Sequence, residues 1–269
     1  MNKIIFIGEC AVGVSLSDAA TLPANAKINI CGNIANAAIK ASSAHTNVSY
    51  VSETARDFLG DMIISHMQSV GIDTLSIDRY TEGGATTVYF TDGDATHAEV
   101  IHAHRPDRKF DTVWPRIDPG DVVVFGNYFA LDDRYRQQIV DLLEFATERK
   151  ATRIYTPGFP AQCAPRITKV MPAILDYLDH SDVVITTTSQ LHHIFSESDP
   201  QKAYRNHIRF HAPTAINLSD DSSLLTFSDS NGSVTLSIPA SVSESDILSV
   251  TARACLENKL VAAQITSML

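Results

Sequence analysis

Residues 48–74 read VSYVSETARDFLGDMIISHMQSVGIDT, and this stretch decides the fold. The β-branched and aromatic run 48–51 suits a buried strand, and 58–70 has the spacing of apolar residues that is typical of a helix. Gly60 stands near the start of this predicted helix, and 71–74 closes the block. A strand that passes directly into a helix indicates the first half of a parallel βαβ unit.

The same alternation continues through the rest of the chain. Short apolar runs rich in β-branched residues predict buried strands, and the amphipathic stretches between them predict helices. The predicted strands are 3–7, 48–51, 121–125, 153–155, 182–185 and 214–217, and the predicted helices are 33–44, 58–70, 132–149, 164–179 and 199–211. Two predicted hairpins, over 85–102 and 223–238, interrupt the order. The sequence therefore predicts an α/β protein with a mostly parallel central sheet.

Composition and charge narrow the function classes. The 269 residues can form one body with a sizeable core, and 44% hydrophobic against 19% charged residues is typical of a globular protein. The formal net charge of -10 gives no attraction for phosphate backbones, so we expect no nucleic-acid partner. The short apolar run after Lys3 is unlike a secretory signal, and no stretch reaches the roughly 20 apolar residues of a membrane span. We expect no membrane partner and a cytoplasmic location.

The cysteines predict no metal or disulfide framework. Cys10, Cys31, Cys163 and Cys255 are widely dispersed, without C-x-x-C spacing or clustered histidines. We therefore expect buried thiols and no metal-ligating residues.

A glycine-led segment follows the first predicted strand. Residues 7–9 read IGE, and residues 32–38 read GNIANAA at the start of a predicted helix. Together with the 48–74 block, this order of segments resembles the PfkB (ribokinase-like) carbohydrate kinase family. The resemblance implies a single ribokinase-like domain over 1–269, built as a three-layer sandwich with a mostly parallel central sheet. It also implies a small β lid, with lid strands from about 11–30 and 85–104.

The resemblance assigns roles to the start of that helix. It implies that Gly32, Asn33 and Asn36 bind the substrate, a sugar or related polyol. The bare Gly-x-x-x-Asn motif also fits a close-packing helix cap. Because the family's lid strands often pair with those of a second subunit, we further expect a homodimer formed through the lid.

The phosphoryl-transfer signature of the family is altered in this chain. The family has a Gly-Ala-Gly-Asp turn whose amides line an anion hole and whose aspartate is the base, and the matching residues here are Ser243, Glu244, Ser245 and Asp246. Asp246 thus occupies the place of the catalytic base, and Ser243 and Ser245 occupy the places of the nucleotide-binding glycines. The same residues also suit a plain helix N-terminus, with a serine cap and acidic first turn.

Other departures cluster around the phosphates. Gly13 stands where the family often has a sugar-binding aspartate, and 187–190 (TTSQ) replaces the family's Asn-x-x-Glu motif, so magnesium loses a carboxylate. In 217–223 two aspartates occupy the nucleotide loop. Three hypotheses follow. The chain is a sugar kinase that uses ATP and Mg, or a pseudokinase that binds or senses a sugar without cofactor, or a purely structural dimer subunit.

Overall fold

The strands alternate with helices along most of the chain, as the sequence predicts. The computed structural model describes residues 2–16, 25–80, 88–91, 98–101, 110–158 and 166–269. Its strands are β1 Ile4–Ile7, β2 Ala11–Leu16, β3 Ala26–Cys31, β4 Val48–Ala55, β5 Ile72–Asp73, β6 Ile77–Tyr80, β7 Val88–Thr91, β8 Ala98–Ile101, β9 Val122–Gly126, β10 Thr152–Thr156, β11 Val183–Thr187, β12 Thr214–Leu218, β13 Leu224–Asp229 and β14 Gly232–Ser237. Its helices are α1 Asn33–Ser43, α2 Phe58–Ser69, α3 Asn127–Leu131, α4 Asp133–Glu148, α5 Ile167–Asp179, α6 Thr188–Phe195, α7 Pro200–Ala203, α8 Glu244–Leu256 and α9 Ala262–Met268.

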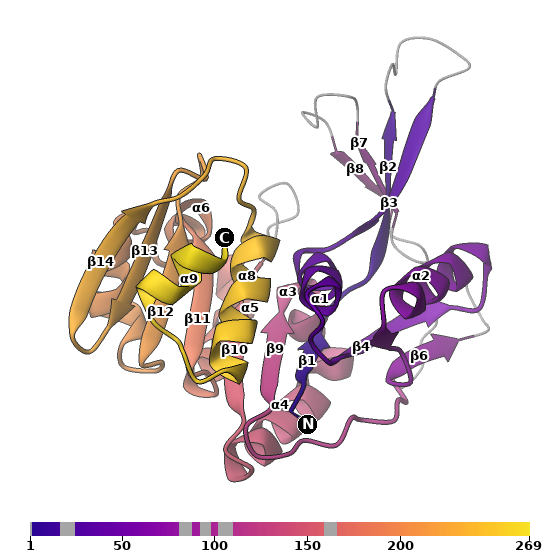
Figure 1. The fold of residues 1–269 in the computed structure, drawn as a ribbon, viewed down its shortest axis with the longest axis horizontal. Coiled ribbons are helices and arrows are strands. Elements are labelled where there is room, and N and C mark those ends of the chain that lie inside the picture. Colours follow the sequence, from indigo (N-terminus) through magenta and orange to yellow (C-terminus); the bar gives the residue numbers. More distant parts are fainter. Residues whose placement is uncertain (1, 17–24, 81–87, 92–97, 102–109, 159–165) are drawn as a thin grey trace.

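One large sheet crosses the molecule (Figure 1). Its order in the described residues is β14-β13-β12-β11-β10-β9-β1-β4-β5, with β6 also paired to β4. Every pairing from β12 through β6 is parallel, and β13 and β14 add an antiparallel hairpin at one edge. The prediction of a mostly parallel central sheet is confirmed.

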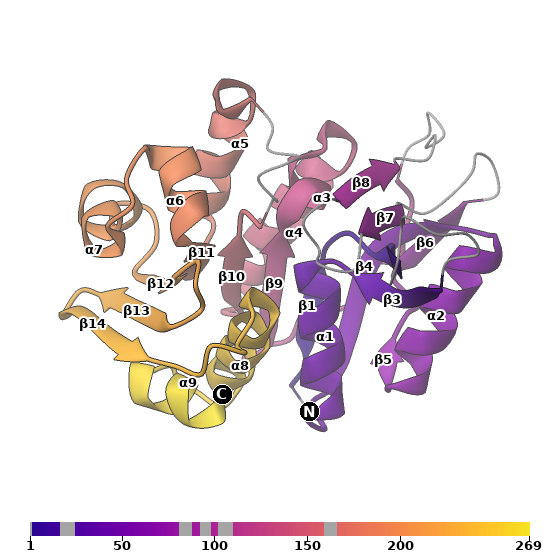
Figure 2. The ribbon, with the colours of Figure 1, turned by 90° about the horizontal axis from the view of Figure 1, so that it is seen from above.

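Helices cover both faces of this sheet, which gives three layers (Figure 2). Side chains of β1 alternate between them because successive residues of a strand point to opposite faces. Ile4 and Phe6 join the hydrophobic cluster that includes α1 and α8, whereas Ile5 and Ile7 join the cluster that includes α4 and α5. A strand buried on both faces reads as a continuous apolar run, which explains why β1 is recognisable in the sequence.

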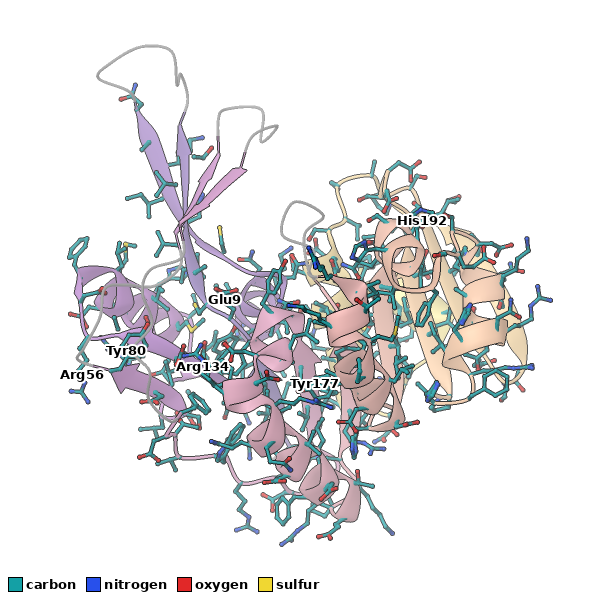
Figure 3. All side chains as sticks on the ribbon, turned by 180° about the vertical axis from the view of Figure 1, so that it is seen from behind. Glu9, Arg56, Tyr80, Arg134, Tyr177 and His192 are labelled. Atoms are coloured by element: carbon teal, nitrogen blue, oxygen red, sulfur yellow. The ribbon has the colours of Figure 1, made fainter. Side chains whose placement is uncertain are left out.

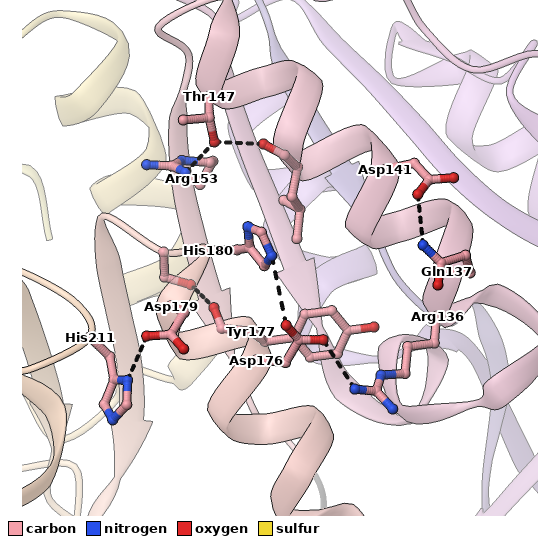
Figure 4. Close-up of polar contacts among 12 residues, drawn as sticks. Arg136, Gln137, Asp141, Thr147, Arg153, Asp176, Tyr177, Asp179, His180 and His211 are labelled. Atoms are coloured by element: carbon pink, nitrogen blue, oxygen red, sulfur yellow. Dashed lines mark hydrogen bonds and ion pairs between the residues drawn. The ribbon is translucent and has the colours of Figure 1, made fainter.

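Polar contacts join the helical layer that contains α4 and α5 to the sheet. They also join helices within that layer to each other. The guanidinium of Arg134 on α4 lies 3.6 Å from the Glu53 carboxylate on β4, on the side shown in Figure 3. Arg136 on α4 pairs with Asp176 on α5 at 3.0 Å, and His211 bonds Asp179 at 2.7 Å (Figure 4). Each of these groups therefore has a partner within the fold.

A second, smaller sheet stands away from the large one (Figure 1). Its order in the described residues is β3-β2-β7-β8, and β7 and β8 form an antiparallel pair with Val88 opposite Ile101. The predicted small β lid is confirmed as a separate sheet. The predicted lid range extends into 17–24, 85–87, 92–97 and 102–104, which lie outside the described residues.

One predicted helix differs from the structure. The pattern over 199–211 predicts a single helix, but α7 ends at Ala203 and a π-helical turn, Tyr204–Ile208, follows. Tertiary packing explains the change, because Tyr204 and Ile208 are both buried and the Tyr204 hydroxyl donates to the Pro213 carbonyl at 2.8 Å. None of the helices in the described ranges combines the length and hydrophobicity that crossing a membrane requires.

Gly60 offers a test of the stretch that decides the fold. Its amide donates to the N-cap Asp57 at 2.8 Å, and a Cβ added here would lie 2.0 Å from the Ala55 carbonyl oxygen at the end of β4. Gly60→Ala must therefore displace α2 from β4, and we expect it to lower the free energy of unfolding by roughly 1–3 kcal/mol. Urea denaturation measures the change. The control Ser65→Ala, exposed on the same helix, should stay within about 0.5 kcal/mol, and equal effects of the two changes would contradict the prediction.

Candidate functional site at the strand carboxyl ends

Three helices begin at the carboxyl ends of the parallel strands. α1 follows the small sheet, α6 follows β11 directly, and α8 packs beside α1. Ligands of open parallel α/β sheets bind outside the carboxyl ends of the strands, where helix N-termini present unpaired amides. The predicted site residues lie on two of these helix starts, α1 and α8.

The carboxylate of Glu244 joins these helices. It accepts hydrogen bonds from Asn33 Nδ2 at 2.8 Å, from Thr156 Oγ1 at 2.8 Å and from Gln190 Nε2 at 3.2 Å. These donors come from α1, from the last residue of β10 and from α6. Glu244 itself is only 9% exposed. A negative group of the protein therefore fills the space at the start of α8.

Burial and hydrogen bonding act in opposite directions on this carboxylate. Burial raises the pKa of Glu244, and the hydrogen bonds from Thr156 and Gln190 oppose that rise without cancelling it. The folded protein thus holds the proton of Glu244 more tightly than an exposed glutamate would.

Gln190, which the resemblance aligns with the family's glutamate, makes two kinds of hydrogen bond. Its Oε1 accepts from the Thr187 backbone amide at 3.2 Å in a capping box, and its Nε2 donates to Glu244. A glutamate at 190 would have no hydrogen to donate and would place a second carboxylate against Glu244. The amide at 190 and the carboxylate at 244 are therefore chemically complementary.

The carboxylate of Asp246 also accepts several hydrogen bonds. Its carboxylate accepts from the Ser243 amide at 2.9 Å, from the Ser243 hydroxyl at 2.6 Å and from Lys40 Nζ at 2.6 Å. Burial raises the pKa of Asp246, but the bonds from Lys40 and Ser243 outweigh it, so the pKa is lowered overall. Ser243 is the N-cap of α8 in a capping box with Asp246, and Ser245 lies 3.1 Å from Lys40 Nζ. The capping interpretation is confirmed, and the assignment of Asp246 as a base stays a prediction.

A further carboxylate meets the start of α6. Asp220, in the loop after β12, accepts from the Ser189 amide at 2.9 Å. Its neighbour Asp221 is held by the Ser219 and Ser223 hydroxyls, and these bonds lower its pKa. The two aspartates that the sequence places in the nucleotide loop thus bond the loop itself and the α6 N-terminus.

The start of α1, where the sequence predicts sugar binding, has a backbone conformation that requires glycine. Gly32 caps α1 with a φ of 109°, and a Cβ there would lie 2.9 Å from the Glu9 carbonyl oxygen, so only glycine fits without strain. Asn36 is half-buried one turn beyond Asn33. At Gly13, a Cβ would lie 2.2 Å from the Cys31 sulfur, so the thiol fills the space that a side chain at 13 would use.

Sequence reasoning missed two residues here. Lys40 lies two turns beyond Asn33 on α1, and only the packing of α1 against α8 brings it to Asp246. Asn127, directly after β9, has a φ of 59° and a buried Oδ1 that finds no hydrogen-bond donor among the described residues. A strained, buried polar residue at a strand end is typical of functional sites. The sequence signal that could have identified Asn127 was its position directly after a buried strand that ends at Gly126.

Comparisons with known proteins agree with this architecture. A family model described as pfkB family carbohydrate kinase matches residues 1–231, so the match ends before α8. No curated protein matches the chain in sequence.

Solved structures give the fold match. A PfkB protein from Polaromonas sp. JS666 has 14% identity and a TM-score of 0.80, over 100% of this chain and 93% of that one. Aminoimidazole riboside kinase from Salmonella enterica, complexed with aminoimidazole riboside and an ATP analog, has 12% identity and a TM-score of 0.82, over 99% and 91%. Fructokinase from Vibrio cholerae O395, bound to fructose, ADP and calcium ion, has 12% identity and a TM-score of 0.84, over 100% and 89%. At these identities the likeness concerns the fold.

The buried carboxylate predicts a specific pH dependence of stability. Because the pKa of Glu244 is raised in the folded protein, the folded state binds more protons than the unfolded state, and stability falls as pH rises above the unfolded value. The free energy of unfolding of the wild type, minus that of Glu244→Gln, should therefore decrease between about pH 4 and pH 8. Urea denaturation across this range measures it.

Asp246→Asn is the matched control with the opposite sign. The lowered pKa of Asp246 contributes stability above its unfolded value, and this contribution is lost as pH falls through the folded value. The free energy of unfolding of the wild type, minus that of Asp246→Asn, should accordingly decrease toward acid pH. A flat difference for Glu244→Gln would show that its carboxylate is not buried as described.

Proposed function

Because this chain belongs to the pfkB family of carbohydrate kinases, we propose that it binds a sugar or related polyol beside its small sheet and does not phosphorylate it. The observation that carries the proposal is the buried Glu244 carboxylate at the start of α8. In the family pattern this helix start is a glycine turn whose amides receive the transferred phosphate. Here the Glu244 carboxyl group lies at that helix start instead, bonded to side-chain donors from α1, β10 and α6.

ATP and magnesium do not fit the residues present. A bound triphosphate would meet the carboxylates of Glu244 and Asp246 at α8 and that of Asp220 at α6. Like charges repel, and the repulsion is strongest at Glu244 because it is the buried carboxylate of the three. Among the described residues, no group of three or more His, Cys, Asp or Glu side chains could hold a metal ion without the phosphates of a nucleotide.

The complementary pair of Gln190 and Glu244 supports this proposal. Loss of the family's magnesium-linked glutamate alone would leave an incomplete site, but the amide at 190 donates to the new carboxylate at 244. The two departures from the family pattern, Gln190 and Glu244, are thus hydrogen-bonded to each other. The side chains of these two residues therefore satisfy each other.

The sugar side supports a polyol ligand. Gly32, Asn33 and Asn36 remain at the start of α1, within the part of the chain that the family model matches. The matching solved structures include complexes with fructose and with aminoimidazole riboside, and both ligands carry several hydroxyl groups. Cys31 beside Gly13 replaces an acidic hydroxyl acceptor by a thiol, so the preferred ligand should differ from those of the kinases.

An active kinase is the second candidate, and one observation favours it. Asp246 keeps the place of the family's base, its pKa is lowered, and Lys40 lies 2.6 Å from it. In this reading Asp246 would take the hydroxyl proton, with Ser243 and Ser245 near the phosphates of ATP·Mg.

Thermal denaturation with ligands separates these candidates. We expect ATP·Mg to leave the unfolding midpoint unchanged within about 1 °C. A matching sugar or polyol at about 100 times its Kd should stabilise the protein by about 2.7 kcal/mol and raise the midpoint by roughly 5 °C or more. Asn36→Ala should abolish the sugar effect, whereas the control Asn206→Ala, exposed on the π-helical turn, should retain it.

The same samples provide the contradicting outcomes. Sugar-dependent ADP formation that disappears in Asp246→Asn would establish the kinase and overturn the proposal. Stabilisation by neither sugars nor nucleotides would instead favour a purely structural subunit.

We also propose that two copies associate through the small sheet in the cytoplasm. β3 is an edge strand of that sheet in the described chain, its residues are largely exposed, and Ile28 is 53% exposed. An exposed strand edge with an apolar side chain favours pairing with a second copy.

Ile28→Glu should therefore turn a dimer into a monomer, because it places like charges opposite each other across the shared edge. Light scattering after gel filtration measures the mass. Val113→Glu, at an exposed apolar residue outside the small sheet, should leave the dimer intact. A wild type that is already monomeric would contradict the proposal.

A further inference from the structure

The opposite end of the large sheet carries an unprotected edge strand. β14 is the last strand in the described residues, and it pairs with β13 without interruption from Leu224 opposite Ser237 to Asp229 opposite Gly232. Its sequence, GSVTLS, contains no charged residue and no proline. Natural edge strands usually carry lysine, proline or a bulge, which prevent pairing with other chains. None of these devices is present on β14.

One face of β14 borders an apolar groove. Val234 lies opposite Phe227, and together with Leu260, Val261 and Ala262 they form the apolar part of a groove of about 320 Å³. The rest of its lining, at the β13–β14 turn, is Asp229, Asn231, Gly232 and Ser233. Val234 is 43% exposed and Val261 is 56% exposed. This groove faces the α9 side of the sheet, because Phe227 belongs to the same hydrophobic cluster as Ile265 of α9.

The other face borders a basic depression. Arg205 in the π-helical turn after α7 and Arg209 at its end line a space of about 690 Å³ with the β13–β14 turn. Neither arginine forms an ion pair with a described residue, although Arg209 lies over the Phe210 ring. Asp229 also borders this space and accepts from the Asn231 amide at 2.7 Å, so the two arginines exceed the acidic lining by one charge. Figure 2 shows α7 and α9 on opposite sides of this hairpin.

These three features define one binding surface, which we call the β14 edge: the free side of β14, the Val234 groove and the Arg205–Arg209 depression. We propose that the β14 edge docks an extended segment of a partner protein in which aliphatic and acidic residues alternate. Added strands bind through backbone hydrogen bonds, and their side chains alternate between the two faces of the sheet. Aliphatic side chains would enter the Val234 groove, and carboxylates would reach the two arginines.

Charge favours such a partner over a second copy. β14 has no acidic residue to offer another copy's arginines. Antiparallel pairing of two β14 strands about an axis perpendicular to the sheet would bring both Arg205–Arg209 pairs onto one face. Like charges placed together disfavour that arrangement.

A labelled peptide tests the proposal. The probe is a fluorescein-labelled octapeptide of alternating valine and glutamate, titrated with the 269-residue protein in fluorescence polarisation. We use the Ile28→Glu background, so that association through the small sheet does not contribute. We expect binding that is at least about tenfold weaker in Arg205→Glu/Arg209→Glu and in Val234→Lys. Arg149→Glu, an exposed arginine at the end of α4, should bind within about twofold of the parent.

A second peptide and the arginine variants serve as controls for this experiment. The same residues in two blocks, four valines and then four glutamates, should bind at least about tenfold more weakly, because alternation is lost. Arg205→Glu/Arg209→Glu changes only exposed side chains, so it remains informative if Val234→Lys lowers the melting temperature. Absence of peptide binding, equal binding of the block peptide or an equal loss in Arg149→Glu would overturn the proposal. Self-association that Val234→Lys abolishes would overturn it in favour of a second copy.

Discussion

The buried carboxylate of Glu244 is the constraint on which the functional end of this protein depends. Removing a carboxylate from water costs several kcal/mol, in order of magnitude, unless hydrogen-bond donors replace the solvent. Asn33, Thr156 and Gln190 supply those donors from three separate elements. The starts of α1 and α6 and the end of β10 must therefore meet at the start of α8. A small displacement of any of them would leave a buried charge without its partners.

The departures from the kinase pattern are mutually consistent in their chemistry. Gln190 donates to Glu244, the Cys31 thiol fills the space above Gly13, and Ser243 caps the helix whose first turn contains Asp246. Each change leaves polar atoms bonded or space filled. Buried polar groups normally have hydrogen-bond partners. The Gln190–Glu244 pair meets this requirement, whereas the buried Oδ1 of Asn127 finds no donor among the described residues.

The large sheet separates the two proposed functions in space. The carboxyl ends of its central parallel strands position the polar network, whereas its antiparallel edge presents β14 between an apolar and a basic groove. A parallel interior is covered by helices on both faces, but an edge strand is free to pair. One rigid sheet can thus carry a ligand site and a partner site, and β12 and β13 pair directly between them.

The sequence by itself determined the layered α/β fold, because strands buried on both faces need continuous apolar runs such as Ile4–Ile7, and a packed helix needs an apolar stripe like that of α4. It also identified the altered start of α8, since the capping preferences of Ser243 and Asp246 are local. It did not predict the π-helical turn after α7, the role of Lys40 or the strained Asn127. Only the tertiary structure decided these, because they depend on contacts between residues far apart in the chain: Lys40 meets Asp246 across 206 positions, and Asn33 meets Glu244 across 211.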